Sequence, residues 1–135
     1  MGLDPYALVS AINGVWAQRL VRMNCSSCSR PDSVDEQQLA RLGLQPEQVQ
    51  GYNFMKGAGC LECRNTGYRG RRAIAEVLRL DATTRELLLA RRPMREVREQ
   101  ATQQQGLRSI VEIGLDLVRS GLTTLEEIRR VATTA

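Results

Sequence analysis

The four cysteines are the residues whose type and spacing most clearly indicate chemistry. They form two C-x-x-C pairs, Cys25 with Cys28 and Cys60 with Cys63, and 31 residues lie between the pairs. Two such turns place four thiolates where a tetrahedral ion needs them, each sulfur about 2.3 Å from the metal. Because the chain has no histidine, four cysteines are the only complete nitrogen or sulfur ligand shell that it can build. The pattern predicts a metal site.

Zinc is the ion that we expect at this site. Protein side chains would fill all four coordination positions and leave none for water or substrate, so the metal would be structural rather than catalytic. Three alternatives stay open from spacing alone. An iron–sulfur cluster uses the same ligands, two disulfides require an oxidising compartment, and a redox C-x-x-C requires a thioredoxin-like context that the sequence does not show.

The charge pattern bears on a second function class. The 135 residues carry 19 basic and 15 acidic side chains, a formal net charge of +4. Four arginines follow the last cysteine with no acid among them: Arg64, Arg69, Arg71 and Arg72. This run suggests the alternative of a nucleic-acid-binding zinc ribbon. We favour arginines that offset a zinc–tetrathiolate of charge −2, because the only aromatic platform there is Tyr68, and we expect no nucleic-acid partner.

The elements that must position the cysteines are mainly helical. Asp4 and Pro5 begin an apolar periodicity that predicts an amphipathic helix over 4–23. A capping-box pattern at 33–36 predicts a short helix that ends at Gly43. Residues 52–56 read as a strand that pairs with a second strand over 73–80. Caps and glycines then predict helices over 83–92, 93–105, 109–121 and from 123 to about 132.

The predicted fold class is therefore mainly α with a small β hairpin. A four-cysteine zinc-knuckle subdomain is inserted between an N-terminal helix and a C-terminal helical bundle. The expected segments are 1–24 for the amphipathic helix, 25–80 for the metal-binding subdomain with short strands, and 81–135 for the C-terminal helices. No apolar run approaches the roughly 18 residues that span a bilayer.

Several motifs resemble the type II secretion and type IV pilus assembly ATPases of the GspE/PulE/PilB type. Residues 17–22, AQRLVR, run into the first cysteine pair as in that family, and 59–71 resemble its second knuckle and exit strand, which 74–78 continue. The lead-in MGLDPY and the C-terminal GLTTLEE match as well, so the resemblance covers nearly the whole chain. Ser26 and Ala73 depart from it, since proline and glycine are commoner there.

The resemblance implies a zinc-binding role for Cys25, Cys28, Cys60 and Cys63 in the C-terminal part of a hexameric motor, with 1–24 continuing an ATPase core. It implies partners in the remainder of the ATPase, in neighbouring subunits and in the inner-membrane platform protein, and a place at the cytoplasmic face of the bacterial inner membrane, peripheral to it. The chain has no G-x-x-x-x-G-K-[ST] loop, and its only lysine, Lys56, stands elsewhere. We expect no catalytic residue, no bound nucleotide and no enzyme activity of the chain alone.

Overall fold

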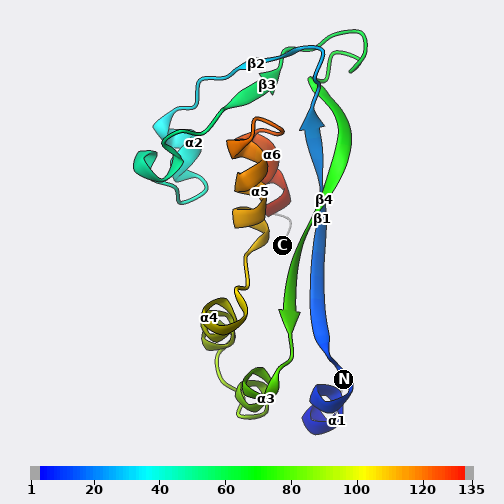
Figure 1. Ribbon diagram of the computed structural model, residues 1–135, viewed down its shortest axis with the longest axis vertical. Helices are drawn as coiled ribbons and strands as arrows, with labels where there is room; N and C mark the ends of the chain where they lie inside the picture. Colours follow the sequence, from blue (N-terminus) through cyan, green and yellow to red (C-terminus); the bar gives the residue numbers. More distant parts are fainter. Residues whose placement is uncertain (1–3, 133–135) are drawn as a thin grey trace. The chain divides into compact units, whose positions relative to one another are not determined.

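Short helices and two pairs of strands make up the chain (Figure 1), and the computed structural model describes residues 4–132. Met1, Gly2 and Leu3 of the lead-in motif lie outside the described residues. The elements follow in the order α1 (Pro5–Ala11), β1 (Gly14–Asn24), β2 (Ser29–Pro31), α2 (Glu36–Ala40), the 3-10 helix η1 (Pro46–Val49), β3 (Met55–Gly57), β4 (Tyr68–Arg79), α3 (Ala82–Leu89), α4 (Met94–Gln105), α5 (Ile110–Arg119) and α6 (Leu125–Ala132).

The helix predicted over 4–23 is wrong beyond Ala11. It begins as expected, because the Asp4 side chain accepts a hydrogen bond from the Tyr6 N–H at 3.1 Å. The helix then stops, and the chain becomes the strand β1 from Gly14 onward. The apolar residues of this segment recur at spacings of three and four. A spacing of four also keeps two residues on the same face of a strand, so the pattern is partly compatible with a strand. The pairing of β1 with the twelve-residue strand β4 outweighs the weak helical preference of this segment.

The strand pairing also differs from the predicted one. The short strand expected at 52–56 is β3, and it pairs antiparallel with β2 in the register Ser29↔Gly57, Arg30↔Lys56 and Pro31↔Met55. The strand expected at 73–80 begins earlier, at Tyr68, and pairs with β1. The predicted hairpin between 52–56 and 73–80 is therefore wrong. The partner of β4 is β1, which the helix prediction had removed from consideration, and the partner of β3 is β2, a strand that the sequence did not predict.

The chain divides into two compact units, each built from separate stretches of sequence. Unit 1 contains Met1–Ala17 and Ala75–Ser109, and unit 2 contains Gln18–Ile74 and Ile110–Ala135. The strands β1 and β4 contribute residues to both units. Helices α3 and α4 belong to unit 1, whereas α5 and α6 belong to unit 2. The functional segments 1–24, 25–80 and 81–135 stay a prediction.

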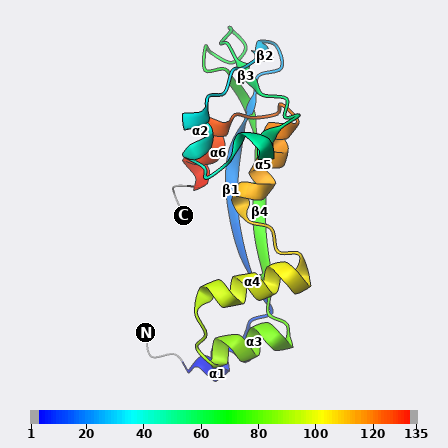
Figure 2. The same ribbon diagram turned by 90° about the vertical axis from the view of Figure 1, so that its left-hand side faces the viewer.

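Unit 2 holds the larger core, and it also carries the four cysteines. Helices α5 and α6 pack against each other and face the paired strands (Figures 1 and 2). Gly114 allows this approach, because a Cβ there would lie 2.7 Å from the Ile128 side chain. The core joins buried apolar residues from the strands, α2, η1 and both helices: Val21, Leu39, Val49, Ile74, Ile110, Leu115, Leu117, Val118, Leu125, Ile128 and Val131.

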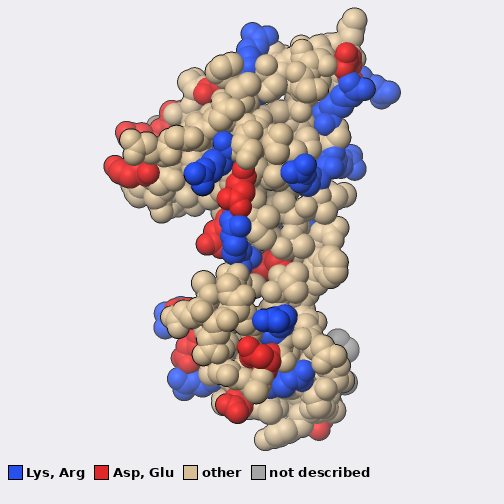
Figure 3. Space-filling model, viewed as in Figure 1, with Lys and Arg blue, Asp and Glu red and all other residues tan. Residues whose placement is uncertain are grey.

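Unit 1 buries Val97 and Ala101 of α4 and adds polar contacts around α1, α3 and α4. Arg85 on α3 donates to the Val9 carbonyl and to Asn13 Oδ1, the latter at 3.2 Å. Arg98 on α4 pairs with Glu76 on β4 at 2.7 Å. These bonds tie sequence-distant segments of the unit together, and on the face seen in Figure 3 basic and acidic side chains are interspersed.

The ends of the C-terminal helices lie where the caps and glycines of the sequence predict them. Gly106 caps α4 in the left-handed conformation with φ 66°, and Gly121, with φ 72°, follows α5. Thr124 caps α6, since its Oγ1 accepts from the Glu127 N–H at 3.2 Å. In α2 the capping box is present, but it is formed by Asp35 and Gln38 rather than by residues 33 and 36. The mainly helical prediction is supported, with six α helices among residues 4–132.

Candidate metal centre

The structure brings the four predicted cysteines together in unit 2. Cys25 and Cys28 lie in the turn between β1 and β2, and Cys60 and Cys63 lie between β3 and β4. All four Sγ atoms are within 4.8 Å of one another. The separations are 3.9 Å for Cys25–Cys60, 3.8 Å for Cys28–Cys63 and 3.7 Å for Cys60–Cys63. Four sulfurs so placed could hold a metal ion.

These separations match a single ion bound by four thiolates. Four sulfurs at about 2.3 Å from one centre, at the corners of a regular tetrahedron, lie about 3.8 Å apart. A disulfide requires a sulfur–sulfur distance of about 2.05 Å, and all four cysteines are free. The four sulfurs are soft ligands and make a complete set of four. Cys25 and Cys63 are buried, whereas Cys28 and Cys60 are half-buried, so the cluster is shielded from solvent on the side of Cys25 and Cys63.

Backbone hydrogen bonds between the two knuckles place the sulfurs. The Cys25 N–H donates to the Gly67 carbonyl at 2.9 Å, and the Ala58 N–H donates to the Cys28 carbonyl at 2.9 Å. The first bond joins the end of β1 to the start of β4, and the second continues the β2–β3 pairing toward the cysteines. Each knuckle is therefore positioned by strand contacts.

Two glycines let the backbones cross beneath the site. A Cβ on Gly57 would lie 1.9 Å from the Gly67 carbonyl oxygen, and a Cβ on Gly67 would lie 2.4 Å from that of Gly57. Gly67 also has φ 77°, which L side chains rarely adopt. The sequence suggested the role of Gly67 as the exit of the knuckle. It contained no signal for Gly57, since the requirement arises from a contact between residues ten positions apart.

Amide donors around the sulfurs favour the thiolate form. The Cys63 Sγ accepts from the Cys60 N–H at 3.1 Å and from the Gly67 N–H at 3.3 Å. Burial raises the pKa of the Cys63 thiol, but these two amides and the neighbouring thiols outweigh it and bring the pKa to about 6. Burial raises the pKa of Cys28 to about 11, although the hydrogen bond from the Gly59 N–H lowers this pKa in part. One thiolate thus forms readily in the cluster, which favours cation capture.

The arginine run after Cys63 does not act as one patch. Arg69 forms an ion pair with Glu62, and the same carboxylate accepts a hydrogen bond from Ser27 at 2.7 Å. This contact links the outer sides of the two knuckles. Arg64 lies in the left-handed region with φ 53°, where it makes the turn that leaves the site. Within the run, Arg69 therefore makes the side-chain contact to the knuckle.

Unit 2 also contains a buried carboxylate on α6. Glu127 on α6 is fully buried, and its carboxylate accepts from the Arg22 backbone N–H at 2.9 Å and from Arg22 Nη2 at 2.7 Å. Arg130 Nη2 donates to it at 2.7 Å. The Arg22 guanidinium also stacks on the Tyr68 ring, 4.3 Å from its centroid. The capping pattern could not reveal this contact, because Arg22 lies 105 residues away.

Comparison with known proteins identifies the family. The family described as "Type II/IV secretion system protein" matches residues 1–130. The chain is 40% identical over 128 residues to the type IV pilus assembly ATPase PilB of Thermus thermophilus, covering 95% of this chain and 14% of that protein. It is 37% identical over 134 residues to the type II secretion system ATPase E of Vibrio cholerae, covering 97% of this chain and 25% of that protein.

The chain thus spans a quarter or less of the length of these relatives. Within residues 4–132, none of the helices has the length and apolar character to cross a membrane. The match covers almost every residue, including both cysteine pairs and the segments that position them. The chain belongs to the family of type II/IV secretion system proteins.

Proposed function

We propose that Cys25, Cys28, Cys60 and Cys63 bind one Zn²⁺ as a closed structural site. The observation that carries this proposal is the separation of the sulfurs, 3.7 to 3.9 Å for the pairs in contact, which fits thiolates around one ion. A cluster of several irons fits less well, because its four cysteines would be divided among two or four irons and the sulfurs on different irons would stand farther apart. The bound ion supplies crosslinking of the two knuckles and no chemistry of its own.

The metal site and its hydrogen bonds together would fix one end of unit 2. The two knuckles connect β1 to β2 and β3 to β4, so joining them holds both strand pairs in register. Leu61, between two of the ligands, is 92% exposed, whereas Cys63 is 5% exposed. A rigid knuckle with an apolar tip is suited to contact another protein surface.

We further propose that the chain is the C-terminal zinc-binding structural and interaction module of a secretion or pilus-assembly motor. The family match and the relatives named as ATPases support this role. The chain contains no phosphate-loop sequence, so we expect that it does not bind or hydrolyse ATP alone. Its partners would be the rest of such an ATPase, neighbouring subunits and the inner-membrane platform protein, at the cytoplasmic face of that membrane.

Metal analysis of the purified chain tests the site. We expect one zinc per chain by elemental mass spectrometry, and the absorption of a tetrathiolate site after replacement by Co²⁺. Cys60→Ser should lose stoichiometric metal, whereas the matched variant Ser26→Ala, within the first knuckle but not a ligand, should retain it. Wild-type protein prepared without chelators that contains less than a tenth of an equivalent of zinc would contradict the assignment.

The module role needs a separate test. We expect no ATP turnover by the isolated chain. We expect ATP turnover only from a longer protein that contains both this chain and a phosphate loop. In a full-length relative, serine in place of the cysteine that matches Cys60 should reduce assembly or turnover, while alanine in place of the non-ligand residue that matches Ser26 should not. Measurable ATP turnover by the isolated chain would show that the module proposal is wrong.

A further inference from the structure

A side-chain contact outside the ligand shell joins the two cysteine turns of unit 2. Ser27 lies between the two ligands of the first turn, and Glu62 lies between those of the second. The Ser27 Oγ donates to Glu62 Oε2 at 2.7 Å, and Arg69, near the start of β4, forms an ion pair with the same oxygen. We call these three residues the outer clasp: Ser27, Glu62 and Arg69.

The outer clasp continues the pairing of the sulfurs at a position that has no sulfur. In three side-chain contacts, the turns are joined at residues 35 positions apart: Cys25 with Cys60, Ser27 with Glu62, and Cys28 with Cys63. The two turns therefore face each other residue by residue. The remaining pair at this separation, Ser26 and Leu61, cannot form a side-chain hydrogen bond, because leucine has no polar side-chain atom.

The position of the outer clasp bears on how a bound ion leaves the site. In a closed site, protein ligands fill every coordination position, so the ion leaves only after sulfur–metal bonds break and the two turns move apart. A contact that keeps the turns together raises the effective concentration of a detached thiolate near the ion, so the thiolate rebinds before the ion is lost. Residues around the ligands of a metal site affect metal affinity in this way without binding the metal themselves.

We propose that Glu62 is a positioning residue of the metal site and that the outer clasp slows the release of bound zinc. The proposal rests on the zinc site proposed above, because the outer clasp acts on release only when an ion is bound. Two donors on one carboxylate oxygen make a charge-assisted contact, which is stronger than a neutral hydrogen bond. The side chains of Glu62 and Arg69 are 53% and 60% exposed, so water competes for this contact and limits its effect.

Release of zinc from the loaded full chain to a chelator tests the proposal. The readout is the first-order rate at which an excess of a chromogenic chelator takes up zinc. Ser27→Ala removes the hydroxyl donor and should raise this rate about fivefold, the effect of losing one exposed charge-assisted hydrogen bond. Ser26→Ala is the matched control in the same turn and should leave the rate unchanged. Ser27→Thr keeps a hydroxyl and should release zinc at the wild-type rate.

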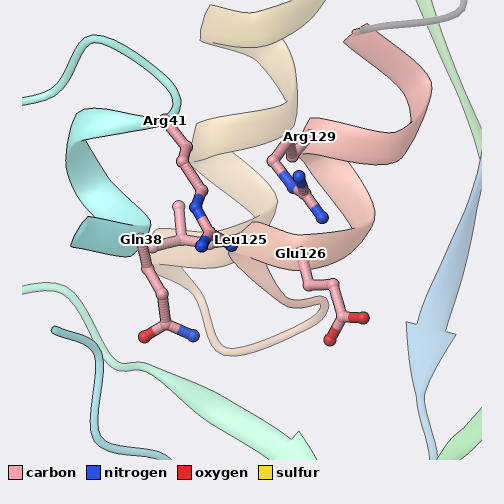
Figure 4. Close-up of a pocket in the computed structure, with 5 residues that line it drawn as sticks. All are labelled: Gln38, Arg41, Leu125, Glu126 and Arg129. Carbon is pink, nitrogen blue, oxygen red and sulfur yellow. The ribbon is translucent and has the colours of Figure 1, made fainter.

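A double substitution shows whether Ser27 acts through Glu62. Glu62→Ala should raise the release rate at least as much as Ser27→Ala does, and Ser27→Ala added to it should have no further effect, because both remove the same contact. Glu126→Ala is the control for loss of a surface carboxylate in unit 2. Glu126 lines a pocket between α2 and α6 (Figure 4) and meets Lys56 at 3.8 Å, so its loss should leave the rate unchanged.

Two further measurements separate positioning from folding. The zinc content and the absorption spectrum of the Co²⁺ form should be the same in the wild type, Ser27→Ala and Glu62→Ala, because the four ligands are unchanged. A changed spectrum in either variant overturns the proposal, since it indicates that the turns have lost their structure. Equal release rates for Ser27→Ala and Ser26→Ala overturn it as well and leave the zinc site standing, whereas a wild-type chain that holds no zinc overturns the site itself.

Discussion

Replacing Glu127 by glutamine tests how strongly a buried carboxylate joins α6 to β1. Glutamine has nearly the same shape and keeps one acceptor oxygen, but it removes the negative charge between two guanidiniums. In the native chain Glu127 is fully buried, and its two oxygens accept bonds from Arg22 and Arg130 at 2.7 to 2.9 Å. The substitution therefore removes the charge and one of the two acceptor oxygens while the shape of the side chain stays nearly the same.

The pKa of Glu127 sets the size of the effect. Burial raises the pKa of this carboxyl, but the hydrogen bonds from Arg130 and Arg22 outweigh burial and lower it from 4.5 to about 2. A difference of about 2.5 units corresponds to about 3 kcal/mol of stability at neutral pH. The side chains of Arg22 and Arg130 are 42% and 52% exposed, so water screens part of this figure. We expect Glu127→Gln to reduce the free energy of unfolding by about 2 kcal/mol.

The assay is urea unfolding followed by far-ultraviolet circular dichroism, with zinc present throughout. Glu126→Gln is the matched control, because Glu126 is the preceding residue on α6, has a 62% exposed side chain and meets Lys56 only at 3.8 Å. That control should change the free energy of unfolding by less than about 0.5 kcal/mol. The slope of the urea dependence should stay the same in both variants, since the exposed surface does not change.

Two results would refute the reasoning about Glu127. One is a loss of stability no larger than that of Glu126→Gln, which would mean that the charge contributes nothing beyond its hydrogen-bond geometry. The other is a loss that is the same at pH 7 and pH 3. Because the native pKa lies below the unfolded one, the stabilisation is complete above about pH 4.5 and disappears as the pH falls toward 2, so the variant and the wild type must converge there.

Three further predictions concern other parts of the chain. Gly57→Ala should lower the metal content and the stability of the chain, because its Cβ would meet the Gly67 carbonyl at 1.9 Å; equal zinc content in the variant, measured by elemental analysis, would contradict this. Gly106→Ala should cost about 1 kcal/mol in thermal or urea unfolding without changing metal content, since φ is 66° and no atom lies within 4 Å. A strong chelator should release the metal and abolish protection from proteolysis within 25–67, while α5 and α6 stay resistant; uniform proteolysis of the whole chain would oppose that division.

Local signals in the sequence predicted much of the C-terminal half. The cap before α6 and the glycines after α4 and α5 act within four or five residues, so their effect could be read from neighbouring positions alone. Each cysteine pair could also be predicted from the sequence, because a turn of four residues determines the spacing of its two ligands. The sequence does not show that the two cysteine pairs lie side by side; the pairing of the strands brings them together.

The prediction of the N-terminal half failed for a related reason. Residues 14–24 have apolar spacings that satisfy both a helix and a strand, and only the presence of β4 as a partner decides between them. This error caused a second one. Because β1 was predicted as a helix, the strand at 73–80 was assigned to pair with 52–56 instead of with β1. A strand has no local hydrogen bonds of its own, so its assignment depends on a segment more than forty residues away.

The sequence by itself determined the ligand chemistry of this protein. Without histidine, and with two C-x-x-C pairs, a complete nitrogen or sulfur ligand shell has to be Cys25, Cys28, Cys60 and Cys63. The tertiary structure decided what surrounds that shell: the crossing of Gly57 and Gly67, and the burial of Glu127 between two arginines. The reason is physical: ligand identity depends on side-chain chemistry within a turn, whereas crossings and buried charges depend on long-range contacts.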